Sequence, residues 1–187
     1  MLDVATGTGD VAIELSQRGM CERRVCGIDF SEPMVRGAQR KLQKNQLSGR
    51  IALSLGDALA LPFRENTFAA SVMAFGLRNV PEKGKALSEM IRVTRWGGKV
   101  ILLEFTIPRR GPLRMFYPFY FKKILPWVGG IISGDREAYS YLPESVSRFG
   151  DVQQYAALMV QCGLENVMVQ SLTFDIVSLI VGTKRQP

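Results

Sequence analysis

The stretch that decides the fold is Leu2-Asp3-Val4-Ala5-Thr6-Gly7-Thr8-Gly9-Asp10, near the start of the chain. Apolar residues that run into a Gly-x-Gly turn and then into a helical pattern are typical of a strand–turn–helix unit. Glycine has no Cβ, so a ligand can come close to the backbone of the turn. The N–H groups and partial positive charge at the start of the helix favour a nucleotide-type cofactor. We therefore expect a cofactor to lie against Asp3, Thr6, Gly7, Thr8 and Gly9.

The rest of the 187-residue chain alternates short β-branched runs with amphipathic segments. This alternation indicates an α/β fold with a mostly parallel sheet covered by helices on both faces. We expect strands at residues 2–5, 24–28, 51–55, 68–75 and 100–105, and helices at 10–18, 31–46, 81–95 and 151–162. Two late strands, at 166–171 and 174–182, predict an antiparallel hairpin at the sheet edge. The length and the absence of a linker indicate a single domain over 1–187.

The charges around the first turn favour S-adenosyl-L-methionine over a dinucleotide. Asp3 and Asp10 place two carboxylates there, which would repel a pyrophosphate and tolerate a cationic sulfonium. The third glycine of the dinucleotide fingerprint is replaced by Ala12, a replacement which that fingerprint tolerates. A NAD-dependent oxidoreductase therefore stays a rival interpretation.

Acidic residues follow the second and third expected strands. Asp29 lies 20 residues after Gly9, the spacing at which a carboxylate accepts hydrogen bonds from ribose hydroxyls. Asp57 and Ala58 follow the third strand, where we expect the adenine ring. A purely turn-forming role is the alternative for Asp57.

The composition excludes several classes of function. The chain has no histidine, which removes histidine bases, catalytic triads and the usual zinc sites, and we predict no metal site. Its three cysteines are too few for a disulfide framework and indicate reduced thiols in a cytoplasmic protein. No apolar run is long enough to span a membrane.

The net charge of +7 is concentrated in one stretch, residues 105–134, which holds five basic residues, seven aromatics and no acid. We expect residues 107–150 to form a helical, basic and aromatic cap inserted in the domain. Such a surface suits peripheral contact with the anionic inner face of a membrane. In the alternative interpretation the aromatics face the core and the basic residues are simply solvated.

Several motifs resemble the ubiquinone/menaquinone-biosynthesis C-methyltransferase family, over nearly the whole chain. They are Asp57-Ala58-Leu59-Ala60-Leu61-Pro62-Phe63, Ala74-Phe75-Gly76-Leu77-Arg78-Asn79-Val80, Arg92-Val93-Thr94-Arg95-Trp96-Gly97-Gly98-Lys99, Leu103-Glu104-Phe105-Thr106 and Gly134-Asp135-Arg136-Glu137-Ala138-Tyr139-Ser140-Tyr141-Leu142-Pro143-Glu144-Ser145. Phe-Gly-Leu-Arg-Asn is the most diagnostic of these. The resemblance implies a Rossmann-like class I S-adenosylmethionine-dependent methyltransferase.

The resemblance also implies a reaction, which is methylation of a ring carbon of a prenylated quinol in respiratory quinone biosynthesis. It implies cofactor contacts from Thr8, Asp29, Asp57 and Ala58, and one from Ala74, where the family carries serine. Trp96 and Thr94 depart from the family pattern as well. The family's segment before the first strand is missing, so we expect the chain to be truncated at its N-terminus.

Arg78 and Asn79 are the expected catalytic residues because they follow the fourth strand, at the sheet edge where open α/β sheets bind ligands. We expect Arg78 to stabilise the negative charge of the quinol oxygen and Asn79 to orient the ring. Loop fixing is the alternative role of this pair. Tyr139 and Tyr141 are weaker candidates for contact with the substrate, and either could be packing instead. Without histidine, the proton must go to a carboxylate, a tyrosine or water.

Other functions stay open at this point. A methyltransferase acting on another small molecule or on RNA would suit the basic charge, although we expect no nucleic acid as partner. A degenerate, non-catalytic methyltransferase fold that acts as a binding subunit is motivated by Ala74 and the missing N-terminal segment. The sequence leaves the oligomeric state open, a homo-oligomer included.

Overall fold

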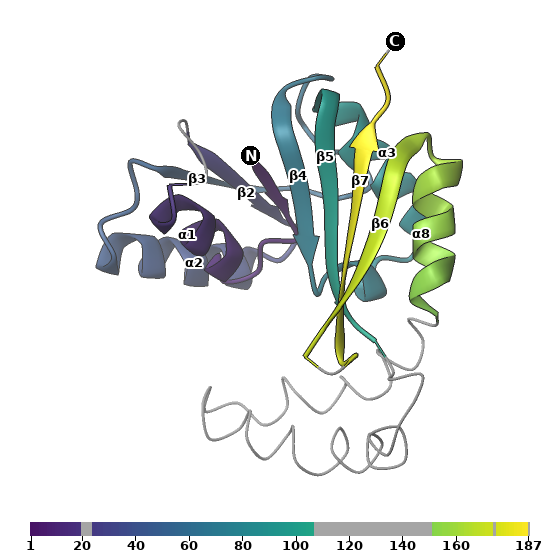
Figure 1. The fold of residues 1–187 in the computed structure, drawn as a ribbon. Coiled ribbons are helices and arrows are strands. Elements are labelled where there is room, and N and C mark those ends of the chain that lie inside the picture. The colour runs from purple at the N-terminus through teal and green to yellow at the C-terminus, as the bar shows by residue number, and fades with distance from the viewer. Residues whose placement is uncertain (20–23, 107–150, 174, 187) are drawn as a thin grey trace.

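A computed structural model describes residues 1–19, 24–106, 151–173 and 175–186, which form a layered α/β unit (Figure 1). The expected cap at 107–150 lies outside the described residues. The elements are β1 (Leu2–Val4), α1 (Asp10–Gln17), β2 (Val25–Asp29), α2 (Glu32–Lys44), β3 (Ile51–Leu55), β4 (Phe68–Ala74), η1 (Leu77–Asn79), α3 (Lys83–Val93), β5 (Thr94–Phe105), α8 (Val152–Gln161), β6 (Leu164–Leu172) and β7 (Val177–Lys184). Among these helices, none has the length and apolarity that crossing a membrane requires.

The described strands form one sheet in the order β3-β2-β1-β4-β5-β7-β6. Strands β1 to β5 run parallel to one another, so their carboxyl ends lie at the same end of the sheet. The strand order reverses between β1 and β4, which is where open parallel sheets bind their ligands. The predicted antiparallel pairing of the last two strands is confirmed, with β7 inserted between β5 and β6.

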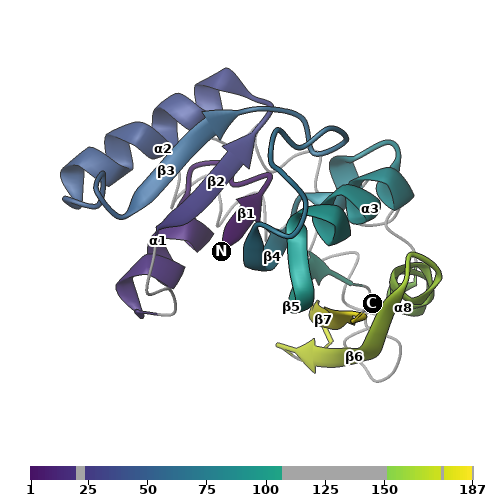
Figure 2. The same ribbon diagram turned by 90° about the horizontal axis from the view of Figure 1, so that it is seen from above.

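Helices cover both faces of this sheet, as predicted (Figure 2). On one face Ala12 of α1 and Leu42 of α2 pack with Val25 and Ile51. On the other face the larger core gathers residues of α3 and α8 against the central strands, and it includes Ile28. Val25 and Ile28 belong to the same strand and face opposite helices, which follows from the alternation of side chains along a strand.

The boundary between α3 and β5 differs from the prediction. The helix ends at Val93 and not at residue 95, and β5 begins at Thr94 and not at residue 100, so that Gly97 and Gly98 lie inside the strand. The pairing of β4 with β5 shifts register between Phe68 and Ala70, so the extra residues of β5 form a bulge. Gly97 has a φ of +73°, which is the left-handed region where glycine is favoured. The glycine pair therefore marks a bulge in a strand, which periodicity alone cannot distinguish from a helix end.

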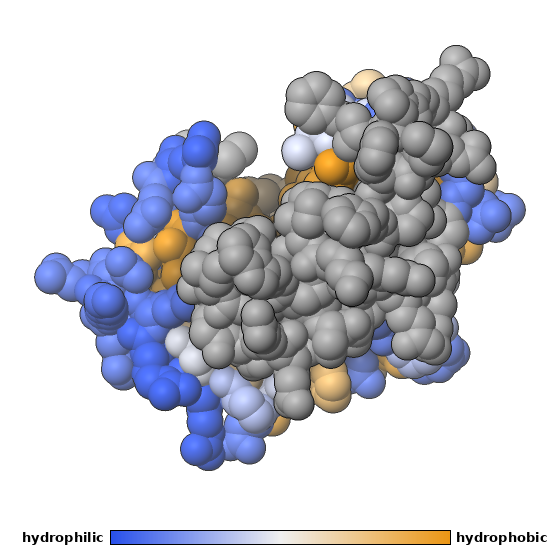
Figure 3. Space-filling model, turned by 90° about the horizontal axis from the view of Figure 1, so that it is seen from below, coloured by the Kyte–Doolittle hydropathy of each residue, from blue (hydrophilic) through white to orange (hydrophobic). Residues whose placement is uncertain are grey.

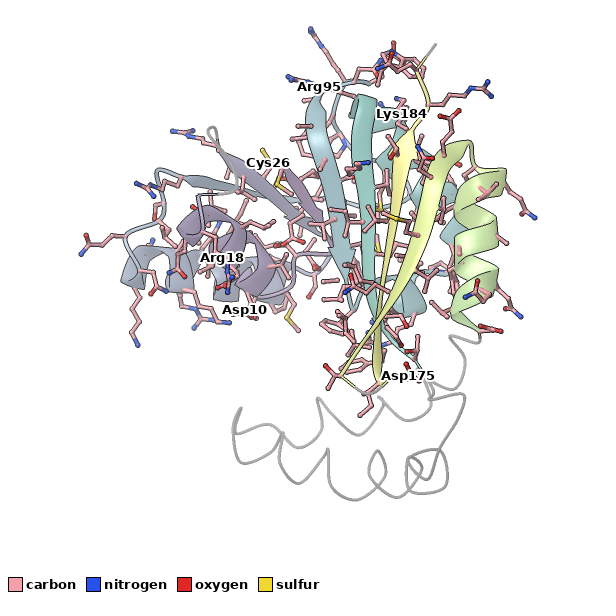
Figure 4. The ribbon with its side chains drawn as sticks, viewed as in Figure 1. Asp10, Arg18, Cys26, Arg95, Asp175 and Lys184 are labelled. Atoms are coloured by element: carbon pink, nitrogen blue, oxygen red, sulfur yellow. The ribbon has the colours of Figure 1, made fainter. Side chains whose placement is uncertain are left out.

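Lys184, at the end of β7, lies at the amino ends of the parallel strands (Figure 4). Its Nζ donates to the carbonyl oxygens of Thr94 at 2.9 Å and Arg92 at 3.2 Å, and to Oδ1 of Asn66 at 2.8 Å. The same Nζ lies 4.4 Å from the centroid of the Trp96 ring. Trp96 thus covers a buried cation, an interaction that tryptophan makes better than any other side chain.

Candidate functional site

The loop after β1 is tied to the end of β2 through backbone and carboxylate. The Thr6 N–H donates to the Ile28 carbonyl at 3.0 Å, and the Gly7 N–H donates to Oδ2 of Asp29 at 2.8 Å. Gly7 and Gly9 have φ values of +55° and +81°, so both lie in the left-handed region. A Cβ on Gly7 would meet no atom of the described residues within 4 Å, so these residues leave that side of the loop open to an approaching ligand. The sequence prediction of a glycine turn that leads into a helix is confirmed.

Asp3 lies beneath this loop and is completely buried. Its Oδ2 accepts a hydrogen bond from Oγ1 of Thr6 at 2.5 Å. Burial raises the pKa of Asp3 to about 7, against the lowering effect of the hydrogen bonds from Thr6 and the Ala12 backbone. The carboxylates of Asp29 and Asp10 raise this pKa further. Asp3 thus braces the loop from inside.

Asp10 is neutralised by a lysine that sequence reasoning missed. Nζ of Lys41, on α2, lies 2.8 Å from Oδ1 of Asp10 and donates to Oγ1 of Thr8 at 2.9 Å. Oγ1 of Thr8 donates in turn to Oδ2 of Asp10 at 2.7 Å. Partial burial raises the pKa of Asp10, but the hydrogen bonds from Lys41 and Thr8 outweigh it and leave the pKa below its ordinary value.

These two environments correct one step of the sequence argument. The repulsion of a pyrophosphate was expected from two bare carboxylates, Asp3 and Asp10. Asp3 is buried with a pKa near neutrality, and Asp10 is paired with Lys41, so the repulsive charge at the loop is much smaller than expected. The choice between a methyl donor and a dinucleotide therefore depends on other features of the site.

Asp29 lies at the meeting point of three strand ends. Its two carboxylate oxygens accept the N–H groups of Gly7 at 2.8 Å and Ser31 at 2.9 Å. Its carbonyl oxygen accepts the Gly56 N–H at 2.9 Å, which brings the residue next to it, Asp57, to the same edge. Each oxygen of a carboxylate can accept a second hydrogen bond, so Asp29 keeps the capacity to bind ribose hydroxyls.

Asp57 and Ala58 lie where the sequence places them, after β3. Oδ1 of Asp57 accepts the Leu59 N–H at 2.9 Å, so this residue does form the turn that was its alternative role. Its side chain is nonetheless exposed, while Ala58 is half-buried and packs on the main core.

Large apolar side chains are exposed beside Asp29 and were not predicted as part of the site. Phe30 is 81% exposed and Leu55 is 56% exposed, at the carboxyl ends of β2 and β3, and Met34 follows in the first turn of α2. Seen from below the sheet, apolar residues reach the surface among hydrophilic ones on the side that holds α1 and α2 (Figure 3). An apolar, flat ligand group such as a purine ring suits side chains of this kind.

The ends of β1 and β4 approach each other closely. Ala5 and Phe75 follow these strands, and both have a φ of +56°, a conformation that non-glycine residues seldom adopt. A Cβ on Gly76 would lie only 2.7 Å from the Cβ of Ala5. Strained backbone of this kind is concentrated at ligand sites, because the surrounding structure must enforce it.

Arg78 ties the loop after β4 to the neighbouring strand β5. Its Nη1 lies 2.6 Å from Oε1 of Glu104, and the two side chains are 4% and 2% exposed. Nη1 also donates to the carbonyl oxygen of Phe75. The guanidinium lies 5.6 Å from the centroid of the Phe105 ring. Glu104 was not among the predicted site residues, although a single acid inside the apolar run of β5 is a signal that a buried partner exists.

The other predicted residues divide between the site and the rest of the chain. Asn79 is exposed in η1, next to Arg78, and its N–H donates to the Gly76 carbonyl at 3.0 Å. Ala74 ends β4 and is half-buried. Tyr139 and Tyr141 lie outside the described residues. Within the described residues, no group of three or more metal-ligating side chains occurs.

Residues 1–184 match the model of the ubiE/COQ5 methyltransferase family. A ubiquinone/menaquinone biosynthesis C-methyltransferase UbiE of Geobacter sulfurreducens is 40% identical over 98% of this chain and 72% of its own length. A demethylmenaquinone methyltransferase of Thermus thermophilus is 42% identical over 98% of this chain and 82% of its own length.

Solved structures agree on the architecture. A SAM-dependent methyltransferase from Aquifex aeolicus superposes with a TM-score of 0.70 and 21% identity, covering 97% of this chain and 80% of that protein. An S-adenosyl-L-methionine-dependent methyltransferase from Methanococcus maripaludis gives 0.71 and 18%, covering 100% and 77%. The predicted Rossmann-like methyltransferase fold is thereby confirmed.

Proposed function

Because the chain belongs to the ubiE/COQ5 methyltransferase family, we propose that it transfers a methyl group from S-adenosyl-L-methionine to a ring carbon of a prenylated quinol. The observation that supports this most directly is the arrangement of Asp29 beside the open glycine loop, at the point where strand order reverses. Several relatives named as demethylmenaquinone or ubiquinone/menaquinone C-methyltransferases favour a quinol as substrate.

The residues present fit this cofactor. Asp29 would accept hydrogen bonds from the ribose hydroxyls, and the exposed Phe30 and Leu55 would cover the adenine ring. Gly7 leaves space above the loop for the rest of the cofactor. When bound, S-adenosyl-L-methionine supplies an activated methyl group on a sulfonium, so the protein's main task is alignment. Asp57 and Ala58 would border the adenine, and Thr6, Thr8 and Gly9 shape the loop.

The substrate side of the site is assigned to the η1 segment. A quinol ring carbon becomes nucleophilic when its hydroxyl loses a proton to a carboxylate, a tyrosine or water, and a nearby cation stabilises the resulting oxygen anion. The carbon then takes the methyl group as the S–CH3 bond breaks, and S-adenosylhomocysteine leaves. We assign this charge stabilisation to Arg78 and the orientation of the ring to Asn79. Both follow β4, next to the end of β1. Ala74 would border the methyl donor from the same strand, and Tyr139 and Tyr141 are proposed to contact the substrate.

The membrane is the proposed source of the quinol. The basic and aromatic stretch 105–134 suits contact with anionic headgroups, because basic groups meet phosphates while aromatic rings lie at the interface. The protein would then work in the cytoplasm and bind transiently at the membrane's inner face. Cosedimentation with anionic liposomes, compared with neutral ones, tests this; an RNA gel shift without liposome binding would favour the RNA methyltransferase instead.

The activity itself is tested by methyl transfer from labelled S-adenosyl-L-methionine to reduced demethylmenaquinone and to a reduced demethylated benzoquinone. We expect label in the ring of at least one quinol. A chain that binds S-adenosylhomocysteine but labels neither quinol would contradict the proposed substrate. Such a result would support another small molecule as substrate or a non-catalytic binding subunit.

A further inference from the structure

Glu104 is a buried acid in an otherwise apolar stretch of β5. Its neighbour Leu102 is 1% exposed, and Glu104 itself is equally buried. Three donors satisfy its carboxylate: Nη1 of Arg78 at 2.6 Å, the Phe105 N–H at 3.1 Å and the Arg78 N–H at 3.3 Å. The carboxylate thus contacts both the main chain and the side chain of Arg78.

These donors come from two different strand ends. Arg78 follows β4 through the Phe75–Gly76 turn, while Phe105 ends β5. The rings of Phe75 and Phe105 lie 4.5 Å apart between centroids, and Nη1 of Arg78 also donates to the Phe75 carbonyl. Glu104 therefore ties the loop that carries Arg78 to the adjacent strand.

Burial of the Arg78–Glu104 ion pair costs desolvation free energy. Burial raises the pKa of Glu104 even though Arg78 lies beside it and lowers it. Buried ion pairs commonly give no more stability than apolar side chains of similar volume. Stability alone therefore does not account for an arginine and a glutamate at these positions. The contacts give a geometric reason, because Nη1 of Arg78 donates both to the Glu104 carboxylate and to the Phe75 carbonyl, which holds the guanidinium at the ends of β4 and β5.

We propose that Glu104 is a positioning residue for methyl transfer, which fixes the Arg78 guanidinium at the substrate side of the site. The inference depends on the proposed role of Arg78 in catalysis. Glu104 does not itself contact the substrate in this account. Its loss is expected to change the rate of the chemical step and not the binding of the methyl donor, because Glu104 contacts none of the residues proposed to hold that donor.

The test compares Glu104→Gln, Glu104→Asp and Lys184→Met with the parent. Lys184→Met is the matched control, since it removes a buried charge toward the other end of the sheet. Glu104 pairs with Ser178, six residues before Lys184, which is about 20 Å at 3.3 Å per strand residue. We expect Glu104→Gln to lower kcat for the quinol at least tenfold and to change the Kd for S-adenosylhomocysteine less than threefold. Glu104→Asp should recover part of kcat. Lys184→Met should leave both values within twofold.

Two outcomes overturn the proposal. One is an unchanged kcat in folded Glu104→Gln, and the other is a loss of kcat matched by an equal loss of cofactor affinity. Where Glu104→Gln does not fold, the double variant Arg78→Met with Glu104→Leu replaces the pair by apolar side chains. That variant should fold, bind S-adenosylhomocysteine and lack turnover. Parental turnover in it would overturn the proposal equally.

A second readout separates this inference from the proposed function. The Arg78 and Phe105 N–H groups both donate to Glu104, so Glu104→Gln should make at least one of them exchange with solvent deuterium tenfold faster or more. Unchanged exchange at both would contradict the positioning role, whatever the substrate is. Faster exchange in a protein that methylates no quinol would contradict the proposed function only.

Discussion

Gly76 and Ala5 approach so closely that a Cβ on Gly76 would lie 2.7 Å from the Cβ of Ala5. The contact joins the end of β4 to the end of β1. The strand order of the sheet reverses between these two parallel strands. Ala5 is itself in the left-handed region, with a φ of +56°. The site therefore depends on a contact that only a residue without a side chain allows.

Replacement of this glycine gives the first prediction. Gly76→Ala should lower the free energy of unfolding by about 1–3 kcal/mol, because the new methyl group overpacks against Ala5. Ala5→Gly should restore most of the loss, since it removes the clashing Cβ and relieves a left-handed alanine. Chemical denaturation of both single variants and the double variant measures this. Strictly additive effects would contradict the contact.

Asp3 predicts a pH dependence of stability. Its folded pKa of about 7 lies above the ordinary value, so the folded protein binds the proton more tightly than the unfolded chain. Stability from this group is therefore fully present below pH 4 and is lost as pH rises toward and through 7. The loss is on the order of 4 kcal/mol. Asp3→Asn cannot ionise, and its unfolding free energy relative to the parent should increase between pH 4 and pH 8. Parallel pH curves for the two proteins would show that Asp3 is not buried as described.

Asp29 predicts an effect on cofactor affinity. Asp29→Asn keeps the size of the side chain but loses a charged acceptor, and hydrogen bonds to charged groups contribute about 1.5–3 kcal/mol. The Kd for S-adenosylhomocysteine should rise at least tenfold. Glu14→Gln is the control, because Glu14 is an exposed acid on α1 that pairs with Arg18. Equal affinities in the two variants would remove Asp29 from the site.

Lys184 predicts a loss of stability without a loss of binding. Lys184→Met removes three hydrogen bonds and leaves the buried Thr94 carbonyl without this donor, which costs about 1–3 kcal/mol. Thermal unfolding should show a lower Tm, while titration with S-adenosylhomocysteine should give the parental Kd. A Tm equal to that of the parent would mean that the Trp96 ring and solvent compensate fully.

The sequence predicts the parts of this molecule that local rules determine. The glycine turn, its helix and the acid after β2 each follow from backbone chemistry that nearby residues specify. The antiparallel pairing of β6 and β7 follows from two apolar runs joined by a short turn. The family motifs added the substrate class, which no local pattern in the chain encodes.

The features that sequence analysis missed are long-range. Lys41 neutralises Asp10 from another helix, and Glu104 holds Arg78 from the next strand. Neither pairing is visible as a spacing along the chain, because the partners are 31 and 26 residues apart. The early start of β5, with Gly97 and Gly98 in a bulge, was missed for a related reason, since its cause is the register with β4.

The central claim is that the loop after β1, with Asp29, holds the adenosine of a methyl donor. Calorimetric titration of the chain with S-adenosylhomocysteine and with NAD tests it most directly. The account predicts saturable binding of one S-adenosylhomocysteine per chain, weakened by Asp29→Asn, and no competition from NAD. Saturable binding of NAD, or S-adenosylhomocysteine binding that is indifferent to Asp29, would contradict it.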